Sequence, residues 1–159
     1  MPKNVKYIPE GSHTLTPYLT IQGAAKAIEF YKKTFGAKEE TRMDGPDGKV
    51  MHAELRIGDS NIMISDELPG ANCKSPSTLR GTTVGLYLYV QDVDEVFGRA
   101  LTAGAKVRQP LENKFWGDRH GELEDPFGHR WSLATHKEDL TPQQIQQRAR
   151  EMFAQPAKA

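Results

Sequence analysis

Two short runs of the chain place a histidine and a glutamate two residues apart. His52 and Glu54 lie in the run MHAELRI, and His120 and Glu122 lie in the run RHGELE. Successive side chains of a β-strand point to opposite faces of the sheet, so residues two apart share a face. Such a pair could act as a general acid and base, or supply half of a metal site. The alternative is a hydrogen-bonded pair on a solvated sheet face.

The first of these pairs is the stronger catalytic candidate. Its run alternates, so His52, Glu54 and Arg56 are expected on one polar face. The apolar residues between them are expected on the opposite face; these are Ala53, Leu55 and Ile57. The second pair has more charged neighbours, which favour simple exposure. We therefore assign the catalytic hypothesis to His52 and Glu54, and rank Arg56 and Glu122 as ligand-binding candidates.

A second constellation lies in the run FWGDR, which contains Trp116, Asp118 and Arg119. Trp116 offers a large π-face for a planar ligand, and Arg119 offers a planar fork of donors for a carboxylate or phosphonate. Gly117 lets the backbone bend, so the two side chains are expected to converge. The alternative is a surface ion pair of Arg119 with Asp118 or Asp125 beside a packed tryptophan.

These residues belong to a repeated pattern. Segment 52–55 matches 120–123 at an offset of 68 residues, and segment 18–23 matches 87–92 at an offset of 69. Such self-similarity indicates a duplicated module. In the first copy, periodicity predicts a strand over 16–21, a helix over 24–35, a strand over 39–43 and a hairpin over 51–65.

The second copy has the same plan. Alternation predicts a strand around 85–90, with Tyr87 and Tyr89 on the face that the helix leaves free, which makes both ligand-binding candidates. A helix capped by Asp92 or Asp94 is expected to run through 103, followed by strands near 106–109, 116–124 and 130–134. The tetrapeptide 125–128, Asp-Pro-Phe-Gly, is typical of a type I turn between the last two strands.

The expected fold class is α+β, with two tandem βαβββ modules forming a cupped mixed sheet, helices on its outer face and a C-terminal helix. We interpret 1–159 as one domain. Its parts are a first module over about 13–66, a Pro-, Gly- and Ser-rich linker over 67–81, a second module over about 82–135 and a helix over about 141–153, with Thr141 as its cap.

Composition excludes several classes of protein. Lys plus Arg and Asp plus Glu both number 21, so the formal charge is zero, which argues against a nucleic-acid or anionic-membrane partner. No apolar run approaches the ~18 residues of a membrane span, and the polar start of the chain does not resemble a signal peptide. The single cysteine, Cys73, excludes a disulfide within the chain. A cytoplasmic protein is expected.

Three runs, FWGDR, DPFGHRWSL and THKEDLTP, together with the two modules, resemble the PhnB-like branch of the vicinal oxygen chelate superfamily. That superfamily includes glyoxalase I, extradiol dioxygenases and bleomycin-resistance proteins. The resemblance covers roughly 12–149 and implies a small-molecule site in the cup of the sheet and a homodimer. It is specific for the fold and weak for the reaction, because one fold hosts many functions.

The resemblance also implies where a metal would bind. The superfamily's metal enzymes take ligands from the first and fourth strands of each module, and these positions fall at Thr16, Met63, Gly85 and Ser132. No usual ligand for zinc, nickel or iron stands there, so no metal is expected at this place. A divalent metal at a non-standard site stays open.

Two functions therefore compete. The first is a glyoxalase/bleomycin-resistance-like protein that binds a planar or anionic small molecule through Trp116, Arg119, Tyr87 and Tyr89. The second is a lyase- or isomerase-type enzyme that uses His52 and Glu54 as acid and base, with or without a divalent metal.

Overall fold

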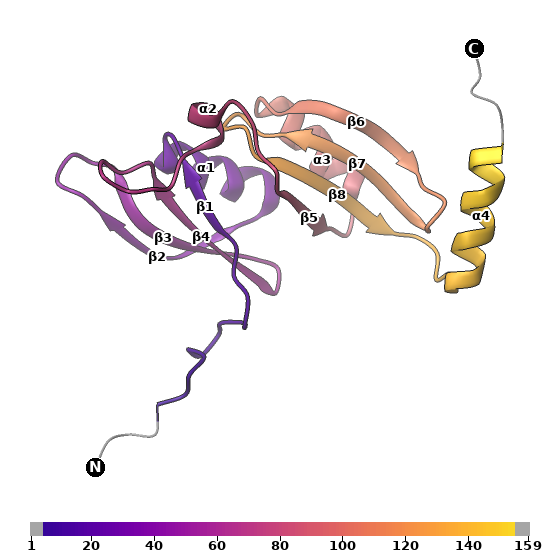
Figure 1. Cartoon of the computed structure of the whole chain (residues 1–159), viewed down its shortest axis with the longest axis horizontal. Coiled ribbons are helices and arrows are strands. Elements are labelled where there is room, and N and C mark those ends of the chain that lie inside the picture. Colours follow the sequence, from indigo (N-terminus) through magenta and orange to yellow (C-terminus); the bar gives the residue numbers. More distant parts are fainter. Residues whose placement is uncertain (1–4, 155–159) are drawn as a thin grey trace. The chain divides into compact units, whose positions relative to one another are not determined.

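The computed structural model describes residues 5–154, and the chain divides between Thr82 and Thr83 into two compact units. Each unit holds a four-stranded sheet, in the order β1-β4-β3-β2 and β5-β8-β7-β6. In each sheet the first and fourth strands pair in parallel and the other pairs are antiparallel. One long helix covers one face of each sheet (Figure 1). The expected α+β fold of two βαβββ modules is confirmed.

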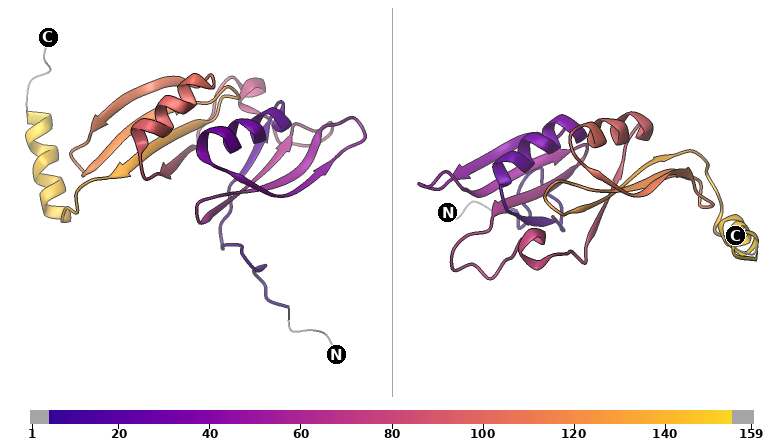
Figure 2. Two further views of the ribbon diagram at one scale, coloured as in Figure 1. Left: turned by 180° about the vertical axis from the view of Figure 1, so that it is seen from behind. Right: turned by 90° about the horizontal axis from the view of Figure 1, so that it is seen from above.

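The first unit carries five elements of the module and one short extra helix. They are β1 (Tyr18–Ile21), α1 (Ala24–Phe35), β2 (Lys38–Asp44), β3 (Val50–Ile57), β4 (Ser60–Asp66) and α2 (Pro76–Leu79). Figure 2 shows from behind how α1 lies across its sheet.

The second unit repeats the module and ends in a helix. Its elements are β5 (Gly85–Tyr89), α3 (Val93–Thr102), β6 (Lys106–Asn113), β7 (Asp118–Glu124), β8 (Arg130–His136) and α4 (Pro142–Ala154). Among residues 5–154, no helix is both long and apolar enough to cross a membrane.

The core of the first unit forms between α1 and the inner face of its sheet. Ile28 and Tyr31 of α1 are fully buried, as are Leu55 and Ile64 of the sheet. Each buried side chain of this size contributes about 1.5–3 kcal/mol to folding. The helix ends at Gly36, whose φ of 68° is left-handed and whose amide donates to the carbonyl of Tyr31. The predicted bounds of this helix are confirmed.

At the start of α1 and of α3, backbone amides donate to a side chain from the fourth strand of the same sheet. Asp66 accepts the amides of Gly23 and Ala24 at 2.9 and 3.0 Å, which fixes the first turn of α1. At the repeat position, Thr135 accepts the amide of Val93 at 2.9 Å and donates to the carbonyl of Val90. These bonds supply partners to helix donors that have none within the helix, and they orient each helix on its sheet.

The linker over 67–81, whose sequence shows no periodicity, contains one short helix. Ser75 caps the short helix α2 by accepting the amide of Thr78. Glu67 accepts the Ser75 amide at 3.0 Å, the Thr78 hydroxyl at 2.7 Å and the Lys74 ammonium at 3.1 Å. These bonds, the amide first, lower the pKa of the Glu67 carboxyl to about 2. A four-residue helix organised by a distant carboxylate has no periodic signal of its own.

The second unit departs from expectation at its helix stripe and its edge strand. Val93, Val96 and Phe97 of α3 are buried, but Leu101 is 37% exposed. Leu86 and Leu88 of β5, an edge strand of its sheet, are only half-buried, whereas Leu19 and Ile21 of the equivalent strand β1 are buried. The alternation itself is as predicted, since Tyr87 and Tyr89 are the more exposed residues of this strand.

A buried carboxylate holds the turn between β7 and β8. The Gly128 amide donates to the Asp125 carbonyl at 3.1 Å, which closes the predicted turn. The Asp125 side chain accepts the amides of Phe127 and His129 at 2.9 and 3.0 Å, and the indole N–H of Trp131 at 2.9 Å. Asp125 is only 4% exposed, so its oxygens depend on these donors for hydrogen bonds.

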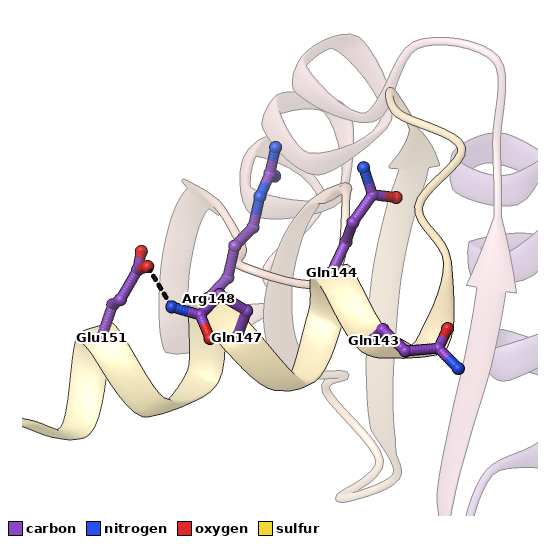
Figure 3. A pocket seen from close by; sticks show the side chains of 5 residues that line it. All are labelled: Gln143, Gln144, Gln147, Arg148 and Glu151. Carbon is purple, nitrogen blue, oxygen red and sulfur yellow. Dashed lines mark hydrogen bonds between the residues drawn. The ribbon is translucent and has the colours of Figure 1, made fainter.

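The C-terminal helix α4 begins with reciprocal bonds and buries no residue. Thr141 accepts the Gln144 amide at 3.2 Å, and the Gln144 side chain accepts the Thr141 amide at 2.8 Å. Two bonds between Arg148 and Glu138, at 2.8 and 3.1 Å, connect the helix to the segment before it. Figure 3 shows the polar side of α4; a hollow of about 510 Å³ beside it is lined by Gln143, Gln144, Gln147, Arg148 and Glu151.

Candidate ligand-binding site

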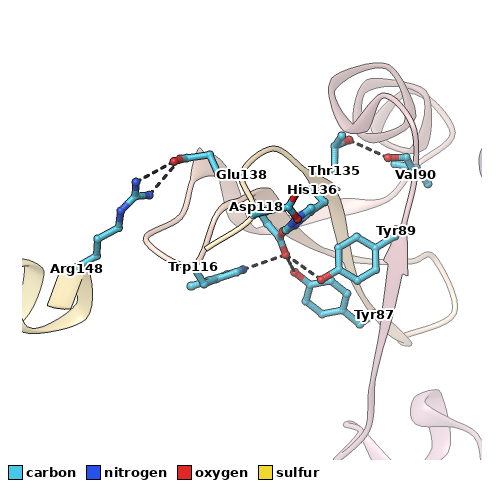
Figure 4. A network of polar contacts seen from close by, with 10 residues as sticks. Tyr87, Tyr89, Val90, Trp116, Asp118, Thr135, His136, Glu138 and Arg148 are labelled. Carbon is cyan, nitrogen blue, oxygen red and sulfur yellow. Dashed lines mark hydrogen bonds and ion pairs between the residues drawn. The ribbon is translucent and has the colours of Figure 1, made fainter. Parts of the chain in front are cut away.

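One carboxylate, that of Asp118, gathers four donors on the face of the second sheet that α3 leaves free (Figure 4). Its Oδ2 accepts the hydroxyls of Tyr87 and Tyr89, each at 3.0 Å, and the indole N–H of Trp116 at 3.1 Å. Its Oδ1 lies 2.8 Å from Nδ1 of His136. Asp118 itself is 3% exposed. We call this group the Asp118 hub.

Electrostatics favour a charged Asp118. Burial pushes the pKa of this carboxyl upward, but the bonds from His136, Tyr89, Tyr87 and Trp116 outweigh burial and leave the pKa below its ordinary value. The pKa of His136 is raised by its contact with Asp118 and then by its contact with Asp139 at 3.0 Å. Burial and the bond to Asp118 raise the pKa of Tyr87, so its hydroxyl stays a donor at neutral pH.

The hub fixes an aromatic surface. The rings of Tyr87 and Tyr89 have centroids 5.0 Å apart, and the ring of Tyr87 stacks on the imidazole of His120 at 5.4 Å. Trp116 meets the same imidazole edge to face at 5.6 Å. Tyr87 and Tyr89 remain 48% and 60% exposed, so their rings are held in place and open to solvent at the same time.

The bend that presents Trp116 needs a glycine. Gly117 has a φ of 99°, and its carbonyl accepts the amides of Lys137 and Glu138 at 2.9 and 3.0 Å. A Cβ on Gly117 would lie 2.5 Å from the Glu138 carbonyl oxygen. The run of residues 116–117 was expected to begin a strand, but the strand starts at Asp118 because these bonds hold the chain in a turn.

Arg119 does not meet Trp116. Its guanidinium makes two bonds to Asp94 of α3, at 2.7 and 2.6 Å, on the helix-covered face of the sheet. Asp118 and Arg119 are neighbours on β7, so their side chains point to opposite faces. The expected convergence of Arg119 and Trp116 is therefore wrong, and so is the alternative pairing of Arg119 with Asp118 or Asp125.

Two further ligand-binding candidates already have partners. Glu122 receives two bonds from Arg130, at 3.1 and 3.0 Å. Arg56 in the first unit donates to Glu40 at 3.0 Å and to the carbonyl of Gly11 at 3.4 Å. A ligand at either position has to compete with an internal ion pair.

The proposed catalytic pair lies on the open face of the first sheet, as the alternation predicts. Nε2 of His52 is 3.4 Å from Oε1 of Glu54, and Nδ1 of His52 is 2.9 Å from the hydroxyl of Tyr18. Tyr18 was not singled out by the sequence analysis. The available signal was its match to Tyr87 at the repeat offset of 69.

The superfamily's usual metal does not fit this chain. Thr16 precedes β1, and the side chains at Met63, Gly85 and Ser132 offer a thioether, a hydrogen and a hydroxyl. None of these is a usual zinc, nickel or iron ligand. Within residues 5–154, no cluster of three or more His, Cys, Asp or Glu side chains is arranged to hold a metal ion.

The sequence analysis named Asp118 and His120 but did not assign them the roles they have in this site, as the common acceptor and as the ring under Tyr87. It did not single out His136, which bonds to Asp118. Asp118 and His120 share a face of β7, but His136 comes from the end of β8, opposite Asp118 in the register. Only the strand pairing brings them together.

The fold, the repeated module and the open aromatic face together agree with one family model, which matches residues 12–133. The chain belongs to the glyoxalase/bleomycin resistance protein/dioxygenase superfamily. Within this superfamily, protein Mb0911c of Mycobacterium bovis is 47% identical over 135 residues, covering 83% of this chain and 89% of the relative.

Solved structures of other proteins share the fold. A PhnB protein from Bacillus cereus, described as a putative 3-demethylubiquinone-9 3-methyltransferase, is 21% identical with a TM-score of 0.63, covering 77% of this chain and 99% of its own. TnmS3, an antibiotic binding protein from Streptomyces sp. CB03234, is 24% identical with a TM-score of 0.59, covering 79% and 97%. At these identities the likeness concerns the fold alone.

Proposed function

We propose that this protein binds a small planar molecule on the open face of its second module. The observation that carries the proposal is the Asp118 hub, which holds Tyr87, Tyr89 and Trp116 in fixed positions while leaving the tyrosine rings exposed. Aromatic side chains that are already ordered lose little conformational freedom when a ligand stacks on them. That TnmS3 of the same fold is an antibiotic binding protein supports this class of function.

The two tryptophans of the chain give a direct test. In a ¹⁵N-labelled sample, each indole N–H gives one resonance. The indole N–H of Trp116 donates to Asp118, and the indole N–H of Trp131 donates to Asp125 in the core. A panel of planar aromatic compounds is expected to shift the Trp116 resonance and leave that of Trp131 in place. Trp116→Leu, which lacks this resonance, should weaken binding about tenfold or more, as measured by calorimetry.

Arg119→Ala is the matched control for this titration. Because Arg119 bonds to Asp94 on the opposite face, the variant is expected to keep the parent affinity. A tenfold loss of affinity in Arg119→Ala would show that Arg119 does belong to the binding surface. No shift of the Trp116 resonance with any planar compound would overturn the proposed function.

A second function, acid–base catalysis in the first module, is favoured by the chain of contacts from Tyr18 through His52 to Glu54. With Nδ1 accepting from Tyr18, Nε2–H can donate to Glu54, so the imidazole could pass a proton between them. We expect the protein to accelerate deuterium exchange at the carbon beside the carbonyl of hydroxyacetone, measured by NMR in D₂O. Glu54→Gln should lower that acceleration about a hundredfold. Exchange at the uncatalysed rate with the parent protein would exclude this role.

We also propose that the protein forms a homodimer, with α4 in the contact. Met152 and Phe153 are 48% and 76% exposed on a helix that buries none of its residues, and closed two-fold dimers are the commonest homo-oligomers. Light scattering is expected to give twice the chain mass of 17.8 kDa. Met152→Ser together with Phe153→Ser should shift the mass toward one chain. A parent mass of 17.8 kDa at micromolar concentration would contradict the proposal.

A further inference from the structure

His120 lacks the hydrogen bonds that a buried imidazole normally makes. It is 6% exposed, and its Nδ1 is enclosed with no hydrogen-bond partner. Its only described neighbours by ring contact are Tyr87, stacked at 5.4 Å with an interplanar angle of 18°, and Trp116 at 5.6 Å. Buried polar groups are almost always paired, because an unmade bond costs the full desolvation of the group.

The first module shows what His120 is missing. There the equivalent histidine, His52, has Tyr18 on one ring nitrogen and Glu54 on the other. In the second module the equivalent tyrosine, Tyr87, gives its hydroxyl to Asp118 and presents only its ring face to His120. The hub thus takes away the internal partner and leaves Nδ1 of the imidazole without one.

The charge state of His120 limits what that partner can be. Burial, and then the nearby Lys114, lower the pKa of the imidazole, whereas Glu122 and Asp118 oppose the shift. At neutral pH the ring is therefore neutral, with one nitrogen a donor and the other an acceptor. A hydroxyl group satisfies either nitrogen, because it both donates and accepts.

We propose that His120 is the hydrogen-bonding group of the binding site and that the ligand is a planar aromatic molecule with a hydroxyl on its edge. The inference rests on the proposed function, since it assigns the polar contact of the same aromatic surface. Tyr87 stacks on the face of the imidazole, whereas a hydrogen bond to a ring nitrogen lies in the plane of the ring, so the hydroxyl can bond to His120 without displacing Tyr87 from Asp118.

Two matched probes test the inference: 2-naphthol, and 2-methylnaphthalene, which has a methyl group in place of the hydroxyl. Dissociation constants are read from the Trp116 indole resonance. The parent protein is expected to bind 2-naphthol about three- to tenfold more tightly, as one net hydrogen bond allows. In His120→Phe, which keeps an aromatic ring on Tyr87 and Trp116 but has no nitrogen, this preference should vanish.

The outcomes separate this inference from the proposed function. If both probes bind the parent equally, or if His120→Phe keeps the preference, the binding surface stands and the role of His120 is wrong. If neither probe shifts the Trp116 resonance, the planar site is wrong and the inference falls with it.

A measurement on the parent protein keeps the inference testable even if His120→Phe does not fold. Imidazole nitrogen spectra of the five histidines should show a shift at His120 with 2-naphthol and none with 2-methylnaphthalene. His120→Gln, which restores a donor and an acceptor, should recover part of the preference. An unmoved His120 resonance with 2-naphthol bound would overturn the assignment.

Discussion

Replacing Asp125 with alanine is expected to lower the free energy of unfolding by about 3–5 kcal/mol, the largest stability effect that we predict for a single side chain. The change removes the acceptor for the amides of Phe127 and His129 and for the indole N–H of Trp131. Each donor left unpaired in the interior costs about 1–3 kcal/mol. The total is a large part of the free energy of unfolding of a typical domain, which is roughly 5–15 kcal/mol.

Urea unfolding followed by tryptophan fluorescence measures this loss. Asp47→Ala is the control, because Asp47 lies in an exposed turn of the first module, between β2 and β3, and accepts one exposed amide, that of Lys49 at 3.2 Å. We expect that control to stay within about 0.5 kcal/mol of the parent. Equal effects of the two variants would show that the buried carboxylate does not hold the second hairpin.

Asp118→Asn is expected to cause the largest loss of binding. The carboxamide keeps one acceptor oxygen and turns an N–H₂ group toward donors, so it cannot serve Tyr87, Tyr89, Trp116 and His136 together. Bonds to a charged group are worth about 1.5–3 kcal/mol each. Affinity for a planar ligand should fall by at least tenfold, because the aromatic side chains lose their common anchor.

Titration of the Trp116 indole resonance with 2-naphthol measures the effect, and the free variant should already show this resonance displaced. Asp94→Asn is the control: it weakens the contact to Arg119 on the other face and should leave the affinity unchanged. Parent-like affinity in Asp118→Asn would mean that the hub does not organise the binding surface.

The sequence predicted the elements whose signals are local. The helix over 24–35 has its apolar stripe and a terminal glycine, and the turn over 125–128 has the residue types that a type I turn requires. Alternation also placed His52 and Glu54 on the open face of their strand. Each of these features depends on residues within a few positions of one another.

The rest depended on contacts between distant segments. Helix α2 exists because Glu67 reaches Ser75 and Thr78, and neither partner is visible in a periodic pattern. Strand β7 begins at Asp118 and not at the predicted residue 116, because the Gly117 carbonyl accepts amides from the chain about twenty residues later. Arg119 follows Asp118 on β7, so its side chain lies on the opposite face of the sheet, where it bonds to Asp94 of α3.

Where the second module has Asp118, the first has Val50, which is fully buried. At the positions equivalent to Tyr89, Trp116 and His136, the first module has Thr20, Gly48 and Glu67. An aspartate at position 50 would therefore arrive beside one tyrosine, with most of its donors absent. Of the four donor positions, only that of Tyr87 has the same residue, Tyr18, in the first module. The aromatic surface is therefore a property of one module and is not repeated in the other.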